Sequence, residues 1–250
     1  MMMRRMRGLK ALSGLVALLC VASWTGAGER EEFTDEFALE DCKFSNVGRN
    51  AYFSLVPGDQ LVLAGDDDGE EVVVRITALP DKKWVAFETA DGETLWVKTR
   101  VIEEREWKDG ELAEVSRNFF ARCKQTNDVY YFGEDVDNYE DGQIVNHDGS
   151  WQAGFDEARP GLIMPGTFLL GSRYFQEIAP GEALDRAEHL EMGLELTVPA
   201  GVFEDCVEIE ETTPLEPDSE STKIYCSGIG MVVDDEIELV EFDIDDEDDD

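Results

Sequence analysis

The chain has 250 residues, of which 58 are Asp or Glu and 21 are Lys or Arg, and its formal net charge is −37 at pH 7. A polyanion of this size repels nucleic acid and anionic lipid surfaces, so the composition excludes a nucleic-acid-binding protein. Salt, divalent cations or a basic partner would relieve the self-repulsion of such a chain.

The first 27 residues have the three parts of a secretory signal peptide. An apolar run extends from residue 11 to about residue 24, and the small residues Thr25, Gly26 and Ala27 follow it. The basic residues that precede the run are Arg4, Arg5, Arg7 and Lys10. The run is shorter than the roughly 20 apolar residues that a membrane-spanning helix needs. The segment therefore predicts cleavage near Ala27 and export to the periplasm, the cell surface or the medium, with no transmembrane segment in the mature chain.

Cysteine usage fits an exported protein. Cleavage would remove Cys20 and leave four cysteines, which are Cys42, Cys123, Cys206 and Cys226. An even number in an oxidising compartment predicts disulfides, and four cysteines allow three connectivities. Cys206 with Cys226 is the favoured pair because both fall on neighbouring predicted strands joined by a turn-rich segment. Buried free thiols are the alternative.

In chain order, residues 28–43 are acidic with scattered phenylalanines and predict a flexible leader or a short helix. Short β-branched segments separated by Asp-Gly turns then fill residues 44–242, which we interpret as a single β-rich domain. The pattern predicts a mostly β fold, a curved antiparallel sheet or barrel. Residues 50–148 and 166–242 share a loose order of segments and predict two similar meander halves, with two separate β domains as the alternative. Residues 243–250 form an acidic tail.

Several segments together resemble a family of exported, β-rich bacterial proteins of unknown function. They are YYFGEDVDNYEDGQIVNHDGSWQAG, RPGLIMPG, LGSRYFQEIAPGEALDRAE, TVPAGVFEDCVEIEETTPLEP and the Gly228-Ile229-Gly230 turn. In that family a Tyr-Phe-Gly-Glu-Asp strand, a Pro-Gly turn and a Pro-Leu-Glu-Pro loop recur. The resemblance covers roughly residues 50 to 240, and it implies a secreted β-rich unit but no activity. The chain departs from it at Tyr225-Cys226-Ser227-Gly228, where the family would have Tyr-Ala-Pro-Gly.

Residues 129–151 hold the strongest candidate for a metal site. If Asp141-Gly142 is a two-residue type I′ turn, regular pairing places Glu140 opposite Gln143 and Tyr139 opposite Ile144. Continued along the strands, it places Asp137 opposite Asn146 and Asp135 opposite Asp148 and gathers four candidate ligands on one face of the hairpin. These ligands are Asp135, Asp137, Asn146 and Asp148. Facing like charges predict either a solvated cluster or a weak calcium site. The solvated cluster is favoured, because calcium takes about 6 to 8 oxygen ligands and this group supplies about four.

Catalytic signatures are missing from the sequence. His147 and His189 are the only histidines, and no serine or cysteine nucleophile motif accompanies them. Four tryptophans could line a sugar platform, although tryptophans in small β proteins more often pack in the core. They are Trp84, Trp96, Trp107 and Trp151.

The favoured interpretation is a non-catalytic binding or scaffolding protein, without a cofactor unless calcium binds. One alternative is a carrier that holds a lipid or another apolar ligand in a concave β cavity. The other is a hydrolase that acts on an extracellular substrate, which would need catalytic groups converging in a pocket.

Overall fold

The computed structural model describes residues 33–67, 69–89 and 92–244. The residues from Phe33 onward belong to one compact unit. The fold is mostly β, as predicted, and the one helical element in these ranges is the short 3-10 turn Leu39–Asp41. No helix within them is long and apolar enough to cross a membrane. The predicted signal peptide, Cys20 and most of the acidic tail lie outside the described residues.

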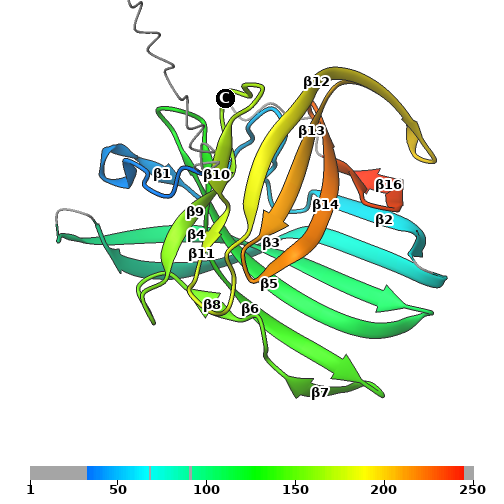
Figure 1. The fold of residues 1–250 in the computed structure, drawn as a ribbon, viewed down its shortest axis with the longest axis horizontal. Coiled ribbons are helices and arrows are strands. Elements are labelled where there is room, and N and C mark those ends of the chain that lie inside the picture. Colours follow the sequence, from blue (N-terminus) through cyan, green and yellow to red (C-terminus); the bar gives the residue numbers. More distant parts are fainter. Residues whose placement is uncertain (1–32, 68, 90–91, 245–250) are drawn as a thin grey trace, which may run out of the picture. The chain divides into compact units, whose positions relative to one another are not determined.

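The first part of the sheet is a five-stranded antiparallel meander (Figure 1). Its strands are β2 (Gln60–Asp67), β3 (Glu70–Glu88), β4 (Thr94–Lys108), β5 (Glu111–Cys123) and β6 (Val129–Glu140). Asp109-Gly110 joins β4 to β5, and Asp141-Gly142 follows β6. Both residues of each turn have positive φ, 49° and 80° in the first turn and 49° and 72° in the second. This backbone is that of a type I′ turn, which Asp-Gly favours.

A second antiparallel meander follows later in the chain. Its strands are β12 (Arg186–Val198), β13 (Gly201–Thr213), β14 (Glu216–Cys226), β15 (Gly230–Asp234) and β16 (Ile237–Asp243). In Figure 1, β12, β13 and β14 run steeply across the strands of the first meander. Strand β16 pairs with β2, with Leu239 opposite Leu63. The two meanders are therefore parts of one hydrogen-bonded sheet.

A bent segment nearly closes this sheet into a barrel. Strands β10 (Arg173–Phe175) and β11 (Glu177–Ile178) lie on either side of Gln176. The first pairs with β12, and the second pairs with β9 (Arg159–Met164), which itself pairs with β6. A Cβ atom at Gly161 would lie 2.8 Å from the backbone nitrogen of Glu177, so this close approach requires glycine. Closure satisfies backbone groups that an open sheet edge would leave exposed.

Residues 33–43 pack on the barrel, which differs from the flexible leader predicted for residues 28–43. The backbone N–H of Thr34 donates to the carbonyl of Arg173 at 3.0 Å. The Phe37 ring meets Tyr130 edge-on with 5.7 Å between centroids, and Leu39 is buried. Acidic residues surround these apolar side chains in the sequence, so the segment shows no hydrophobic periodicity that would predict its burial. Residues 28–32 lie outside the described part of the chain.

Three short strands border the main path of the sheet. Strand β1 (Phe44–Ser45) pairs with β5, while β7 (Gln143–Asn146) and β8 (Trp151–Gln152) pair with β6.

Two pairs of sulfur atoms lie at disulfide distance. One pair joins Cys206 on β13 to Cys226 on β14, which are directly opposite each other in the ladder. This is the pair that the sequence favoured. The other joins Cys42 to Cys123 at the end of β5 and ties the N-terminal stretch to the sheet. Disulfides are typical of proteins that fold in an oxidising compartment.

Candidate functional site

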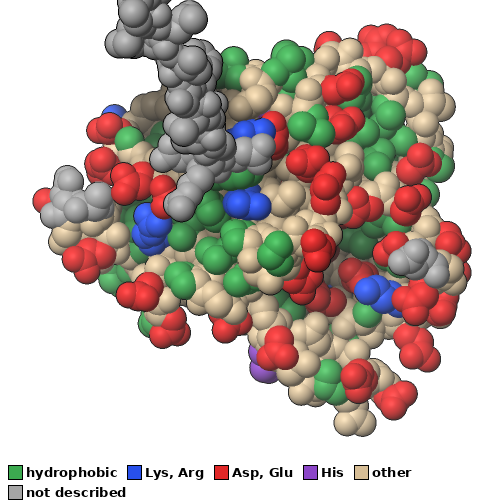
Figure 2. All heavy atoms as spheres, viewed as in Figure 1, with side chains coloured by type: hydrophobic (Ala, Val, Ile, Leu, Met, Phe, Trp, Pro, Cys, Tyr) green, Lys and Arg blue, Asp and Glu red, His purple; other side chains and the backbone are tan. Residues whose placement is uncertain are grey.

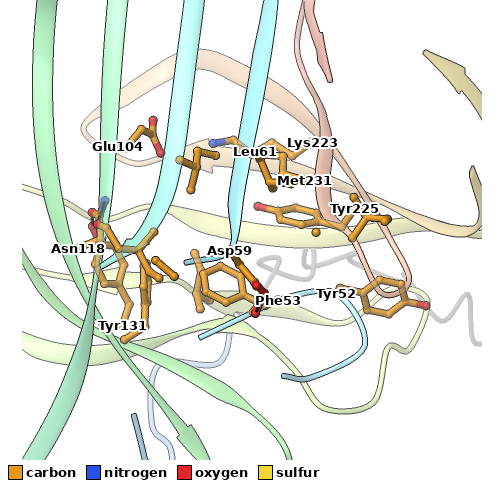
Figure 3. Close-up of a pocket in the computed structure, with 18 of the residues that line it drawn as sticks. Tyr52, Phe53, Asp59, Leu61, Glu104, Asn118, Tyr131, Lys223, Tyr225 and Met231 are labelled. Carbon is orange, nitrogen blue, oxygen red and sulfur yellow. Dashed lines mark hydrogen bonds between the residues drawn. The ribbon is translucent and has the colours of Figure 1, made fainter. Parts of the chain in front are cut away.

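A cavity of about 200 Å³ lies inside the barrel, between the two meanders (Figure 3). Much of its wall is apolar and comes from inward-facing positions of both meanders and of the segments that join them. The apolar residues are Phe53, Leu61, Ile76, Ala78, Ile102, Phe120, Ile163, Ile229, Met231 and Ile244. Protein interiors are normally filled to close packing, so a cavity of this size is a feature that side chains have left open.

Polar groups also line the cavity, and a bulge in β6 helps to place some of them. Gly133 has a φ of 135°, and the pairing with β5 shifts there, so that Tyr131 lies opposite Phe120 and Glu134 opposite Asn118. Both β6 side chains therefore face the same side of the sheet although they are three residues apart. The Tyr131 hydroxyl donates a hydrogen bond to the side-chain oxygen of Asn118.

Lys223 is the cation of the cavity wall. On β14 it lies opposite Asp234 of β15, with 3.6 Å between Nζ and the carboxylate, and it binds Glu211 of β13 at 3.2 Å. Burial alone would lower the pKa of Lys223, but these carboxylates raise it well above its ordinary value. Gln176, the residue at the bend between β10 and β11, donates to Glu211 at 2.6 Å. The bent segment is thereby attached to this ion-pair network.

Two carboxyl groups of the cavity wall, and that of Glu134 beside the lining residue Tyr131, are held in an unfavourable environment. Burial, with a smaller contribution from neighbouring acids, raises the pKa of Glu104 to about 7, although the charge of Lys223 partly opposes the shift. Burial also raises the pKa of Glu134 to about 8 and that of Glu177 well above its ordinary value. In Figure 3 the Glu104 carboxylate and the Lys223 ammonium group point toward each other across the cavity. Strongly shifted acids in a cavity are a frequent mark of a functional site.

A second cluster, around Asp59, anchors another part of the cavity wall. Arg49 forms hydrogen bonds with both oxygens of the Asp59 carboxylate, the shorter at 3.0 Å, and the Ser54 hydroxyl donates to it as well. These contacts neutralise Asp59 and fix the loop that carries Phe53 against the cavity.

The candidate calcium ligands are arranged differently from the predicted register. The pairs Tyr139–Ile144 and Glu140–Gln143 form, but a bulge after Asn138 places Asn146 opposite Asn138. The predictions that Asp137 faces Asn146 and that Asp135 faces Asp148 are therefore wrong. Asn146 Oδ1 accepts hydrogen bonds from the side chain of Asn138 and from the backbone N–H of Asp148. These bonds end the strand, and the regular ladder does not continue.

Protein cations neutralise two of the four candidate ligands. Lys83 contacts both oxygens of Asp135 at 3.0 Å, and Arg117 contacts Asp137 at 2.9 Å. His147 Nδ1 lies 2.9 Å from the other oxygen of Asp137. Within the described ranges, no three or more His, Cys, Asp or Glu side chains are grouped so that they could hold a metal ion. Lys83 therefore offsets the charge of Asp135.

His189 has a structural role in a buried contact outside the cavity. Its ring stacks on Phe168 with 3.7 Å between centroids, its Nε2 lies 2.9 Å from the Tyr174 hydroxyl, and its Nδ1 lies 3.0 Å from the carbonyl of Leu169. Burial lowers the pKa of His189 to about 4. The imidazole is therefore neutral at neutral pH, with both nitrogens engaged.

The four tryptophans do not form one platform. Trp151 is buried, and Trp107 is half-buried beneath the guanidinium group of Arg75. Trp84 and Trp96 are 57% and 65% exposed. Trp84 lies opposite Lys98, and Trp96 lies opposite Ala86, so the two indoles are diagonal neighbours on one face of the β3–β4 hairpin.

Sequence reasoning missed the cavity residues Glu104, Glu177, Glu211 and Lys223. Each lies in a strand, where alternate side chains face the interior. Which set faces inward depends on bulges that the sequence does not mark. Among 58 acidic residues, an interior carboxylate has no distinguishing signal of its own.

Fold and cavity together define a class of protein, a nearly closed, barrel-like antiparallel sheet with a small internal cavity. No protein-family model matches the chain, and no curated protein or solved structure is significantly similar to it. The resemblance to exported bacterial proteins therefore stays a prediction.

Proposed function

We propose that this protein is an exported binding protein that holds a small organic ligand inside its barrel. The observation that carries the proposal is the internal cavity of about 200 Å³, whose largely apolar wall also carries polar and charged groups. A pure scaffold gains stability by filling its interior. A binding protein needs a preformed cavity in which a few polar groups orient the ligand.

The size of the cavity limits the ligand. Pockets for drug-sized molecules measure roughly 300–1,000 Å³, so this cavity fits a smaller molecule or one end of a longer one. Export is supported by the signal-peptide pattern at the N-terminus and by the two disulfide pairs. The ligand would then be met outside the cytoplasm.

The proposal is tested with an uncharged fluorescent probe of apolar surfaces, N-phenyl-1-naphthylamine. We expect saturable binding of one probe per chain, measured by the rise of its fluorescence. Ala78 lines the cavity, and Ala78→Phe should lower the affinity at least about tenfold by filling the space, a loss of about 1.4 kcal/mol or more. Val202→Phe is the matched control, because Val202 is exposed on β13. Unsaturable binding, or unchanged binding by a folded Ala78→Phe variant, would overturn the proposal.

Carbohydrate binding by the exposed Trp84–Trp96 pair is a second candidate function. Two neighbouring exposed indoles offer flat apolar faces, and such exposure is unusual for residues of this size. We expect a glycan array to give binding that Trp84→Ala and Trp96→Ala each remove and that Ala78→Phe preserves. Binding that survives both tryptophan substitutions would contradict this candidate.

A further inference from the structure

The charged groups around the barrel cavity are strongly unbalanced. Among the described residues that line it, five are acidic and one is basic. The acidic residues are Asp59, Glu104, Glu177, Asp185 and Glu211, and the basic residue is Lys223. The whole chain is acidic, and Figure 2 shows acidic side chains spread over the visible face. Interior positions differ from surface ones, however, because burying an ionised carboxylate without a partner is costly.

Protein groups neutralise only part of this acidity. Asp59 is bound by Arg49, and Glu211 is bound by Lys223 and Gln176. Among the described residues, none forms an ion pair or a hydrogen bond with Glu104. Lys223 is already engaged by Glu211 and Asp234, and its charge opposes only part of the shift in the pKa of Glu104.

Glu177 adds a buried and poorly satisfied carboxyl group. Its Oε2 is inaccessible to solvent and has no hydrogen-bond partner of normal geometry among the described residues. The indole of Trp151 lies close enough to lower the pKa of Glu177, but the two groups do not form a hydrogen bond of normal geometry. A buried polar atom left in this state costs free energy that a donor from a ligand would recover.

The shape and lining of the cavity select the kind of cation. The described acidic side chains do not converge as a metal site would require. They are spread around a space that is also lined by the rings of Phe120, Tyr131 and Tyr225. Aromatic faces attract organic cations, and the apolar wall suits a hydrocarbon part.

We propose that the cavity binds an organic cation, a small amine whose ammonium group lies between Glu104 and Glu177. Its apolar part packs against Leu61, Ile102 and Phe120. Each carboxylate accepts a charge-assisted hydrogen bond from the ammonium group. This inference deepens the proposed function and rests on it, because it names the class of ligand for the same cavity.

Binding of a cation is expected to release protons. Burial raises the pKa of Glu104 to about 7 and that of Glu177 well above its ordinary value, so the empty cavity holds protons that an ammonium group would replace. The affinity for an amine should therefore rise with pH, while the affinity for a neutral analogue should not change. The other charged groups that act on these two residues are Glu106, Glu114, Glu134, Asp185, Glu211, Lys223 and Asp234.

Three ligands of equal chain length test the proposal: hexylammonium, hexanol and hexanoate. Calorimetry of the full chain at about pH 8 should give the tightest binding for hexylammonium, at least about tenfold tighter than for hexanol, as expected for one charge-assisted hydrogen bond. At about pH 6 the preference for the amine should shrink, because the carboxyl groups there keep their protons. The heat of binding should also vary with the ionisation enthalpy of the buffer.

Isosteric variants separate charge from packing. Glu104→Gln and Glu177→Gln should each lower the affinity for hexylammonium about tenfold and leave the affinity for hexanol unchanged. Glu238→Gln, at an exposed position on β16, is the matched control and should change neither affinity.

The possible failures are distinguishable. Equal binding of the amine and the alcohol, or tightest binding of hexanoate, would overturn the cation inference and leave the cavity-binding function standing. If neither hexanol nor the naphthylamine probe binds, both proposals fall.

Discussion

Arg100 shows how a single buried charge can hold several loops in place through hydrogen bonds to backbone carbonyls. Its side chain is 2% exposed, and its guanidinium group donates to the carbonyls of Asn46, Leu55 and Leu79 at 2.9, 3.2 and 3.1 Å. Burial lowers the pKa of Arg100. The planar group, with five donors, satisfies carbonyls from the N-terminal stretch and from β3 at once. It thereby fixes the loop before β2 that carries Phe53 into the cavity wall.

Arg100→Met should lower the free energy of unfolding by about 3 kcal/mol, because it leaves several buried carbonyls without donors. The measurement is chemical denaturation followed by tryptophan fluorescence. Lys98→Met, at an exposed position two residues earlier on the same strand, is the control and should stay within about 0.5 kcal/mol of the parent protein. A small effect for Arg100→Met would mean that water replaces the guanidinium donors.

At the scale of elements, the two disulfides connect very different lengths of chain. Cys42 and Cys123 are separated by 81 residues, and Cys206 and Cys226 by 20 residues. The first crosslink ties the N-terminal stretch to β5, while the second joins adjacent strands that hydrogen bonds already hold together. A crosslink restricts the unfolded chain more strongly when the loop that it closes is longer.

We therefore expect the double substitution Cys42→Ser and Cys123→Ser to cost more stability than Cys206→Ser with Cys226→Ser. Chain entropy predicts losses of about 4.5 and about 3 kcal/mol for the two loops. Denaturant midpoints and slopes of the two variants and the parent protein would measure the difference. The reverse order would show that contacts in the folded state outweigh the restriction of the unfolded chain.

At the scale of the whole molecule, interior carboxyl groups give stability an unusual dependence on pH. The pKa of Glu104 rises from 4.5 to about 7 on folding, and that of Glu134 rises from 4.5 to about 8, mainly because both groups are buried. Between the unfolded and folded values, the folded state binds more protons than the unfolded state. The free energy of unfolding therefore falls as the pH rises through this interval.

The melting temperature should decrease by about 5 °C or more between about pH 5 and about pH 8, which differential scanning calorimetry can measure. Glu104→Gln and Glu134→Gln should each flatten this decrease, because glutamine has no proton to lose. The surface variant Glu238→Gln should leave the slope unchanged. A melting temperature that rises with pH would contradict the assignment of buried, protonated acids.

The sequence predicted the repeated hairpins because their signals are local. Asp-Gly at positions 109–110 and 141–142 adopts the left-handed conformation that a type I′ turn needs, and β-branched runs on either side form strands. The favoured Cys206–Cys226 pair followed from the same reasoning, since one hairpin places the two residues opposite each other.

Local signals do not predict the pairing beyond the first irregularity in a ladder. The bulge after Asn138 moved Asn146 away from Asp137, and the bulge at Gly133 turned Tyr131 and Glu134 to the same side. A shift of one residue exchanges the two faces of a strand, so neither the proposed calcium ligands nor the cavity wall could be read from regular pairing.

The sequence by itself determined the acidic character of the protein, its β hairpins and its pattern of cysteines, because these depend on composition and on neighbouring residues. Only the tertiary structure decided that two meanders share one nearly closed sheet and that Glu104, Glu177 and Lys223 meet in its interior. These residues are 46 to 119 positions apart in sequence. Such distant residues come together through the pairing of β16 with β2 and through the bend at Gln176, and no local propensity encodes either contact.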